Sequence, residues 1–304
     1  MRLLWRHPLP ESAMLLSILL FGGGWLYWVG LLSHWRNGLF AGAGALSGAL
    51  GLLIVQGGIA PVVFPMLLFA AGLAGSLKFV YHPLWQAVGW SLYLLIVLAL
   101  GFRLAPGFAP VTIFEILQAG TLHHIGFAPE KLILLLLTPP LVLTPVALQN
   151  TGWPGRDWPG LTFALLLGIT LAVLVPLALA LDFTRPGWMS GSLLLLAYRL
   201  ADNLLFVCVL EESFFRGIVQ TALIRWFAHW KWPQSPLLGI TAASLLFGVA
   251  HIQGGGAFIL LATVAGFSYG TVYYLTGRIH YAVALHFTIN AVYHLGLSPS
   301  PISQ

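Results

Sequence analysis

The sequence predicts an all-α fold, a polytopic transmembrane helix bundle with about eight to ten spans. Its composition is the first reason: 59% of the 304 residues are hydrophobic, only 7% are charged, and the mean hydropathy is +0.92. A soluble domain carries about 25% charged residues, so most of this chain must face lipid. Apolar segments of about 20 residues, the length of a membrane-spanning helix, recur along it. The chain lacks the alternation of polar and apolar residues that the strands of a membrane barrel need.

The predicted spans follow one another through the whole chain. We expect them near residues 12–32, 39–59, 61–80, 84–102, 131–148, 160–181, 192–215, 236–253, 257–276 and 279–297. Arg2 and Arg6 precede the first apolar run, whose length favours a retained span over a cleaved signal peptide. Only Ala60-Pro61 separates the second span from the third, so the span count stays open.

Turn clusters and polar stretches separate the spans. Three clusters are typical of turns: His82-Pro83, Gly152-Trp153-Pro154-Gly155 and Thr184-Arg185-Pro186-Gly187. The segment 103–131 is more polar and is interpreted as a loop with a short interfacial helix. Almost all polar residues at membrane depth follow Leu193. We therefore predict an N-terminal transmembrane scaffold region over residues 1–185 and a chemically active domain with a buried cavity over residues 186–304.

Charge and cysteine content exclude several classes of function. The net charge of +5 is spread over 13 Lys and Arg residues without a basic run, so nucleic acid is not expected as a partner. Cys208 is the single cysteine, which rules out an internal disulfide framework and a cysteine-rich metal site. Positive charges are nearly balanced between the two sides, so the sequence leaves the orientation in the membrane open.

Two adjacent carboxylates, Glu211 and Glu212, follow a run of apolar residues and are the strongest functional signal. A charged side chain inside a bilayer costs at least a few kcal/mol, so such residues are usually functional. Glu212 and Arg216 are one helical turn apart, and this spacing favours an ion pair. Glu211 points to another face and is left to face a cavity. A partly desolvated, unpaired carboxylate suits a general base or acid.

Two later helices carry further polar residues at the spacing of one turn. Phe247 precedes His251 by one turn, so its ring can form a wall beside an imidazole that shares a water molecule with Glu211. His286 and Asn290 lie on one helical face. Their side chains supply two donors, which suits the stabilisation of a developing oxyanion.

Other polar or small residues are interpreted as structural. Three histidines on apolar helices are interpreted as ordinary buried side chains: His229, His280 and His294. A second set is interpreted as a local polar cluster that aids packing: Arg199, Asp202 and Asn203. Gly266 and Gly270 are typical of a close helix contact. The run 254–256 of three glycines is interpreted as a flexible loop beside His251.

The three motifs in this order resemble those of the CPBP intramembrane proteases, also called the ABI or type II CAAX prenyl endopeptidase family. The match consists of Glu211-Glu212-x-x-x-Arg216, Phe247-x-x-x-His251 and His286-x-x-x-Asn290. The resemblance covers residues 193–297 and implies hydrolysis of a peptide bond near the C-terminus of a membrane-associated protein. It implies that Glu211 and His251 activate water, that His286 and Asn290 hold the oxyanion, and that Glu212, Arg216 and Phe247 support the site.

The residue types leave two mechanisms open. Glu211, His251 and His286 could supply three ligands to zinc and leave one position for water. Alternatively, Glu211 deprotonates the water directly and no cofactor takes part. We favour the second mechanism, because the three residues come from separate helices, the chain has no His-Glu-x-x-His motif, and the family's structural precedent resembles a glutamate protease.

Two other classes of function remain as alternatives. The buried Glu and Arg residues could form the ion or proton path of a transporter or channel, although the chain shows no inverted repeat. The chain could also be a non-catalytic membrane scaffold. Under the favoured hypothesis the partners are a membrane-associated protein substrate and the lipid bilayer, and we expect a multi-pass protein of the bacterial inner membrane. The sequence does not identify the substrate.

Overall fold

The computed structural model describes residues 11–33, 35–77, 82–118, 121–142, 158–187 and 193–299. The chain divides into two compact units, Met1–Leu143 and Thr144–Gln304. Arg2, Arg6 and the turn cluster at residues 152–155 lie outside the described residues. The functional boundary predicted after residue 185 remains a prediction, because the division into units reports packing alone.

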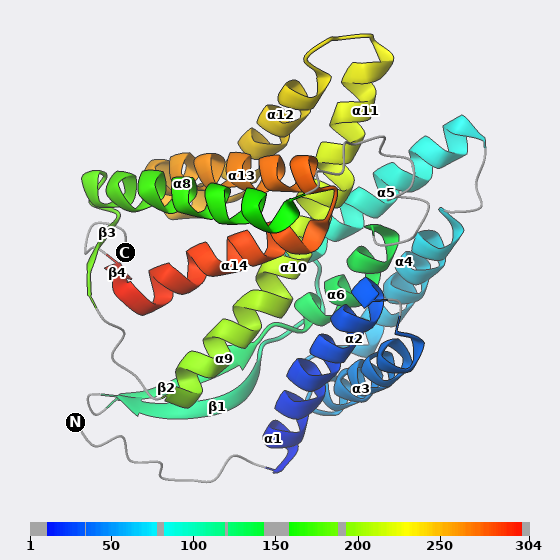
Figure 1. Cartoon of the computed structure of the whole chain (residues 1–304). Helices are drawn as coiled ribbons and strands as arrows, with labels where there is room; N and C mark the ends of the chain where they lie inside the picture. The colour runs from blue at the N-terminus through cyan, green and yellow to red at the C-terminus, as the bar shows by residue number, and fades with distance from the viewer. Residues whose placement is uncertain are drawn as a thin grey trace. The chain divides into compact units, whose positions relative to one another are not determined.

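The first unit is built mainly of apolar helices (Figure 1). Its elements are α1 (Glu11–Ser17), η1 (Ile18–Gly22), α2 (Gly23–Ser33), α3 (Arg36–Val55), η2 (Pro61–Val63), α4 (Phe64–Ser76), α5 (Pro83–Gly101), β1 (Val111–Gln118), β2 (Thr121–Phe127) and α6 (Pro129–Val142). Helices α2 and α3 pack closely because Gly42 has no side chain: a Cβ there would collide with the backbone of Tyr27. Proline starts η2, α5 and α6, where its missing N–H costs nothing.

The segment 103–131 differs from its predicted structure. Instead of the expected short interfacial helix, strands β1 and β2 pair as an antiparallel hairpin, with Glu115 opposite His124 in the register. The stretch Val111–Gln118 is rich in β-branched and aromatic residues, which favour strand conformation. Strand propensity therefore decides the structure of this segment, although its polarity predicts a loop.

The all-α polytopic architecture is confirmed. Within the described ranges, five helices are long and apolar enough to cross a membrane: Glu11–Ser33, Arg36–Val55, Leu84–Gly101, Pro159–Ala180 and Ile252–Thr276. Pro61–Leu73 and Ser235–Ala250 are shorter apolar helices. This number is smaller than the predicted eight to ten spans. Three of the other predicted spans form helices shorter than 18 residues, namely Pro61–Leu73, Ser235–Ala250 and Pro129–Val142, and the predicted span 131–148 ends beyond the described residues. The remaining two carry polar residues: Glu211, Glu212 and Arg216 place charge in one, and His286 and Asn290 make the other less apolar.

The second unit contains the three motifs, and Figure 1 shows its helices. Its elements are α8 (Pro159–Ala180), β3 (Thr184–Pro186), α9 (Leu193–Asn203), η3 (Leu204–Cys208), α10 (Val209–Glu212), η4 (Ser213–Gln220), α11 (Thr221–His229), α12 (Ser235–Ala250), η5 (Ile252–Gly254), α13 (Gly255–Thr276), α14 (Ile279–Gly296) and β4 (Leu297–Pro299). Strand β3 pairs with β4 and thereby fixes the end of α8 to the end of α14.

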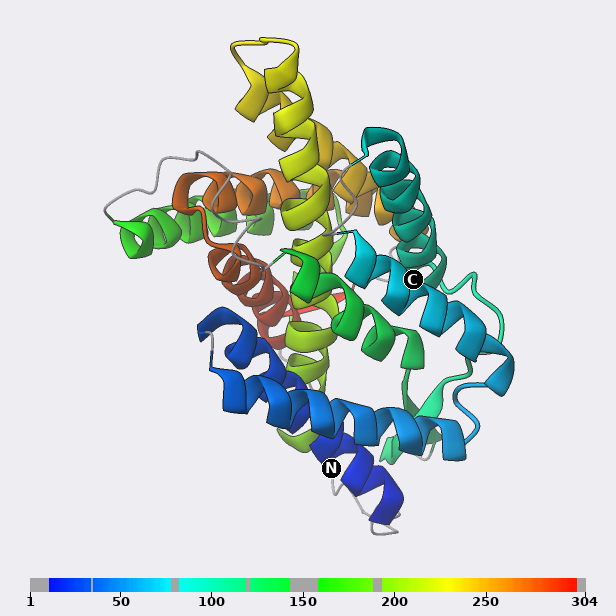
Figure 2. The ribbon, with the colours of Figure 1, turned by 90° about the vertical axis from the view of Figure 1, so that its right-hand side faces the viewer.

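The elements from α9 to α11 form one continuous helix, drawn in yellow-green to yellow in Figure 2. Two π-helical segments, η3 and η4, interrupt its α-helical hydrogen bonding on either side of α10. π-Helical turns change the direction in which side chains leave a helix and occur frequently at functional sites. Helix α10, which carries Glu211 and Glu212, is therefore held between two such turns.

Helix α13 lies at the centre of the unit and packs against α8, α12 and α14. Its contact with α12 is close because Gly248 faces Thr263: a Cβ on Gly248 would collide with the Thr263 hydroxyl. Gly277 adopts a left-handed conformation with φ of 66° and ends α13, as glycine commonly does after a helix. The chain reverses its direction in the turn after Gly277, so that α14 packs against α13.

Candidate active site

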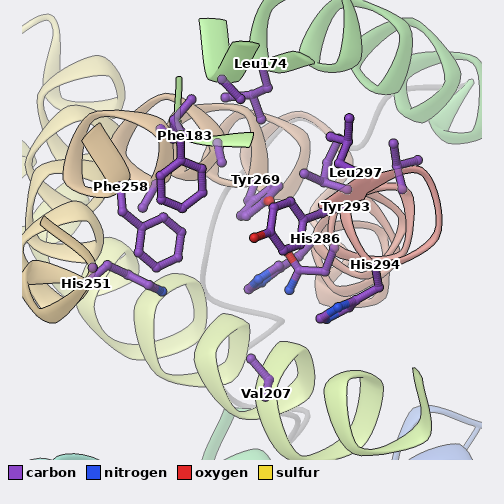
Figure 3. A pocket seen from close by; sticks show the side chains of 18 of the residues that line it. Leu174, Phe183, Val207, His251, Phe258, Tyr269, His286, Tyr293, His294 and Leu297 are labelled. Carbon is purple, nitrogen blue, oxygen red and sulfur yellow. The ribbon is translucent and has the colours of Figure 1, made fainter. Parts of the chain in front are cut away.

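The second unit contains a cavity of about 490 Å³ (Figure 3). This volume is typical of a small-ligand pocket. Its wall includes the motif residues Glu211, Phe247, His251, His286 and Asn290. Side chains that are far apart in the sequence therefore meet at one hollow, as the cluster of motifs predicts.

Glu211 and His251 face each other across part of this cavity. The Glu211 Oε2 atom lies 3.9 Å from the His251 Nε2 atom, and both side chains are partly accessible. This separation is too long for a direct hydrogen bond and suits a bridging water molecule. Although the Glu211 side chain is partly accessible, its Oε2 atom is buried and has no hydrogen-bond partner among the residues that the structure describes.

The other nitrogen of His251 fixes the orientation of the ring. His251 Nδ1 lies 2.8 Å from the carbonyl oxygen of Phe247. A carbonyl oxygen only accepts hydrogen bonds, so Nδ1 carries the proton and donates it to this bond. In the neutral ring, Nε2 is then an acceptor that faces the carboxylate. A water molecule between these two acceptors would donate one O–H group to each.

Glu212 lies outside the cavity wall in a buried ion pair. Its Oε2 atom accepts a hydrogen bond of 2.9 Å from Arg216 Nε, and both side chains are fully buried. This contact is the ion pair that the spacing of one turn predicts. The Arg216 guanidinium also lies over the Phe247 ring, with 5.2 Å to the ring centre. The pair satisfies the buried carboxylate and leaves Glu211 as the carboxylate that faces the cavity.

His286 connects the ion pair to the cavity. Its Nδ1 atom lies 2.8 Å from Glu212 Oε1, so the two oxygens of Glu212 serve Arg216 and His286 separately. The His286 ring stacks on Tyr269 with 4.6 Å between ring centres. These two contacts fix the imidazole plane and leave Nε2 free of the Glu212 contact. Figure 3 shows His251 and His286 at different sides of the same hollow.

Asn290 is held by a residue that sequence reasoning assigned to packing. Its Nδ2 atom donates to Asn203 Oδ1 at 3.3 Å, and the Cys208 thiol donates to the same oxygen at 3.3 Å. Asn203 itself lines the cavity, so it belongs to the site. Its position two helical turns before Glu211 was the available signal, because that spacing places both side chains on one face.

Further parts of the wall were not predicted. Helix α8 contributes four apolar side chains: Leu171, Leu174, Val175 and Ala178. His294, interpreted as a structural histidine, also lines the cavity, as do Phe183 and Phe258, whose rings stack at 5.3 Å. No motif could reveal α8, because this helix is apolar on all sides and has no stripe that marks an inner face.

The three residues that could bind zinc, Glu211, His251 and His286, are not grouped as a metal site in the part of the chain that the structure describes. In the described part of the chain, no group of three or more His, Cys, Asp or Glu side chains is placed to hold a metal ion. Glu211 and His251 approach each other, whereas the nearest carboxylate to His286 is that of Glu212. We therefore derive no step through a metal.

Fold and site together define a class: a multi-pass helical membrane protein with a carboxylate and two imidazoles around an internal cavity. Within that class, residues 192–292 match the family model described as type II CAAX prenyl endopeptidase Rce1-like. The match confirms the resemblance to the CPBP family and supports, at the level of the family, a CAAX-type intramembrane protease that acts on a protein in a membrane environment. No curated protein and no solved structure matches the chain.

Proposed function

We propose that the protein is an intramembrane endopeptidase that cleaves a peptide bond near the C-terminus of a membrane-associated protein. The observation that carries this proposal is the pair of proton acceptors, Glu211 and His251, at 3.9 Å on the wall of the cavity. Two acceptors without a proton between them bind the two O–H groups of one water molecule. That arrangement activates water for attack on a carbonyl carbon.

In the first step, the water oxygen forms a bond to the carbonyl carbon of the substrate and Glu211 takes one water proton. His251 accepts the other hydrogen bond of the water and keeps its oxygen directed toward the carbonyl. The carbonyl π electrons move to oxygen, which gives a tetrahedral oxyanion. When the C–N bond breaks, Glu211 returns the proton to the leaving amine. The intermediate keeps the second water proton on its new oxygen, so the products are a carboxylic acid and an amine. Transfer of that proton from the acid to the amine then gives a carboxylate and an ammonium group.

His286 and Asn290 are proposed to stabilise the oxyanion. With the Nδ1 proton directed to Glu212 at 2.8 Å, His286 donates from Nε2 only when the ring is protonated at both nitrogens. The Glu212 carboxylate stabilises that imidazolium, and Arg216 holds Glu212 in place at 2.9 Å. Asn290 Nδ2 donates to Asn203 Oδ1 at 3.3 Å and makes a longer contact of 3.9 Å with Cys208 Sγ, and the oxyanion would replace this weaker sulfur contact.

The proposed mechanism uses no metal. Hydrolysis by the purified protein should survive exhaustive treatment with a chelator, and metal analysis should find no stoichiometric zinc. Activity that is lost on chelation and restored only by zinc would replace this mechanism with a metal-dependent one.

The function is tested by comparing the membrane proteins of cells that contain the wild-type chain or the Glu211→Gln variant. We expect uncleaved substrates to accumulate with the variant, at a rate of cleavage reduced by at least about a hundredfold. The location proposed for this reaction is a bacterial inner membrane. A Glu212→Gln variant that folds normally should retain more activity than Glu211→Gln. If Glu212→Gln lost more activity than Glu211→Gln, the roles of the two carboxylates would be exchanged. If Glu211→Gln caused no accumulation of uncleaved substrate and Glu212→Gln caused none either, the protein would be a scaffold.

A further inference from the structure

The C-terminal part of the chain has a one-sided charge distribution. Glu212 is the last acidic residue of the sequence, and four cationic residues follow it: Arg216, Arg225, Lys231 and Arg278. Arg216 is buried and paired with Glu212, whereas the other three are exposed. Two of these three, Arg225 and Lys231, lie within seven positions of each other at one end of a helical hairpin. Among the ion pairs of the described residues, none involves Arg225 or Lys231.

The end of the hairpin joins α11 to α12, and we refer to residues 225–234 as the α11–α12 tip. Figures 1 and 2 show these two helices side by side, with the tip beyond the other helices of the second unit. Gly239 permits this close pairing, because a Cβ there would collide with Ile224. Helix α12 is a short apolar helix, so the tip is the place where the hairpin would leave the hydrocarbon of a membrane.

The backbone of the tip is fixed. Lys231 N–H donates to the Ala228 carbonyl oxygen at 2.9 Å, and Trp232 N–H donates to the Phe227 carbonyl oxygen at 3.2 Å. This is the pattern of a helix end closed by a left-handed residue, and the stacked rings of Phe227 and Trp232, 5.2 Å apart, add its usual hydrophobic contact.

Lys231 occupies the position in this motif that glycine normally fills. Its φ of 57° lies in the left-handed region, where a residue with a Cβ is strained. The folded chain thus bears a cost to keep a lysine at this point. Strain of this kind suggests a functional reason for the residue.

Three tryptophans are sequence neighbours of the cations. The exposed fractions are 55% for Trp226, 60% for Trp230 and 49% for Trp232. Indole rings prefer the boundary between hydrocarbon and headgroups, and exposed Lys and Arg side chains at that depth attract anionic lipids. The tip therefore combines apolar anchors for a lipid surface with fixed positive charge.

We propose that the α11–α12 tip binds the headgroup of an anionic phospholipid through Lys231 and Arg225. The two cations attract the phosphate of the headgroup, and the tryptophan rings pack along the glycerol and the upper acyl chains. This site is separate from the cavity, and its test does not require that the protein cleave a substrate.

The test uses the full-length chain in detergent, stripped of lipid and mixed with equal amounts of phosphatidylglycerol and phosphatidylcholine. Native mass spectrometry then counts the lipids that remain bound. We expect the wild-type protein to retain phosphatidylglycerol preferentially. Lys231→Gly and Arg225→Gln should each lower this preference about fivefold, and the double variant should lower it further.

Two controls distinguish lipid binding at the tip from unfolding and from a general effect of positive charge. Lys231→Gly should leave the melting temperature unchanged or raise it, because glycine relieves the strained φ, so lost lipid binding cannot be attributed to unfolding. Arg278→Gln removes an exposed cation at the turn between α13 and α14 and should leave the lipid preference unchanged. The proposal is overturned if the double variant retains phosphatidylglycerol like the wild type, or if Arg278→Gln has the same effect. Displacement of the lipid by millimolar inorganic phosphate would instead indicate a site for free anions.

Discussion

At the scale of single residues, Glu212 organises the site although it does not line the cavity. Its two carboxylate oxygens bind Arg216 at 2.9 Å and His286 at 2.8 Å. Both contacts are buried, and a buried charge is tolerated only when it is paired. Arg216 compensates the charge of the Glu212 carboxylate among apolar helices. It also holds this carboxylate in place as a partner for the imidazole of His286.

Removal of Arg216 should therefore destabilise the protein strongly. Arg216→Met leaves the Glu212 carboxylate buried without its cation, which typically costs about 3–5 kcal/mol. The unfolding free energy in detergent, measured by titration with a denaturing detergent, should fall by this amount. The double variant Glu212→Gln/Arg216→Met removes both charges and should recover part of the loss. Equal stability of the single and double variants would contradict a buried pair.

Asn203 should act on the site through Asn290. Asn203→Leu removes the acceptor at 3.3 Å from Asn290 Nδ2 and should cost about 1 kcal/mol of unfolding free energy. If Asn290 stabilises the oxyanion, kcat should fall while KM changes little, because substrate binding does not depend on that hydrogen bond. Asn203→Asp keeps an acceptor oxygen and should retain more of the activity. Equal losses in both variants would exclude this positioning role.

At the scale of elements, the contact between α12 and α13 sets the place of His251. The His251 N–H donates to the Gly248 carbonyl oxygen at 3.0 Å, and Gly248 itself lies against Thr263 of α13. A side chain at position 248 would also come within 2.8 Å of the Ile259 carbonyl oxygen. Because two neighbouring atoms of α13 block this position, α12 can make room only by moving.

Gly248→Ala should consequently disturb both stability and the site. Overpacking of this kind typically costs about 1–3 kcal/mol, and the shift of α12 would move His251 relative to Glu211. Thermal unfolding in detergent and the rate of substrate cleavage should both report the change. Gly168→Ala is the matched control, because a Cβ on that residue of α8 meets no atom within 4 Å. A Gly248→Ala variant with wild-type stability and activity would disprove the close contact.

Most of the elements could be predicted from the sequence, and the exceptions have physical causes. Hydropathy marks the long helices well, but it cannot show that α9 to α11 form one helix with two π-helical turns, because π turns depend on local packing. The stretch Val111–Gln118 shows β-branched and aromatic residues, but its charged residue directed the interpretation toward a polar loop. A prediction that rests on polarity therefore gives a loop at this stretch, whereas the strand propensity of its residues produces a hairpin.

In the site, as in the fold, residue chemistry could be predicted from the sequence, whereas packing contacts could not. The reactive candidates could be predicted because carboxylates and imidazoles at membrane depth are conspicuous, and Glu212 with Arg216 even followed from spacing alone. Asn203 was missed because an amide beside Arg199 and Asp202 is equally well explained by local packing. Its contact with Asn290 joins residues that are 87 positions apart, and such contacts leave no trace in a single sequence.

At the scale of the whole molecule, the single cysteine offers a measure of global unfolding. Cys208 is fully buried, and its thiol donates to Asn203 Oδ1. A maleimide reagent should therefore leave the native protein unlabelled and react completely after denaturation. Gln234→Cys places a thiol in the exposed turn of the α11–α12 tip and should react at once in the folded protein. Rapid labelling of native Cys208 would show that this part of the core opens readily.

The position of α8 has a consequence for how such proteins can diversify. This helix forms one wall of the cavity with aliphatic side chains, and it precedes residues 192–292, where the family resemblance lies. Exchange of its aliphatic residues for larger or smaller ones would remodel the hollow without altering any acid, base or amide. Related proteins could in this way come to bind different substrates while the motif residues stay the same. Two proteins with identical motifs therefore need not share a substrate.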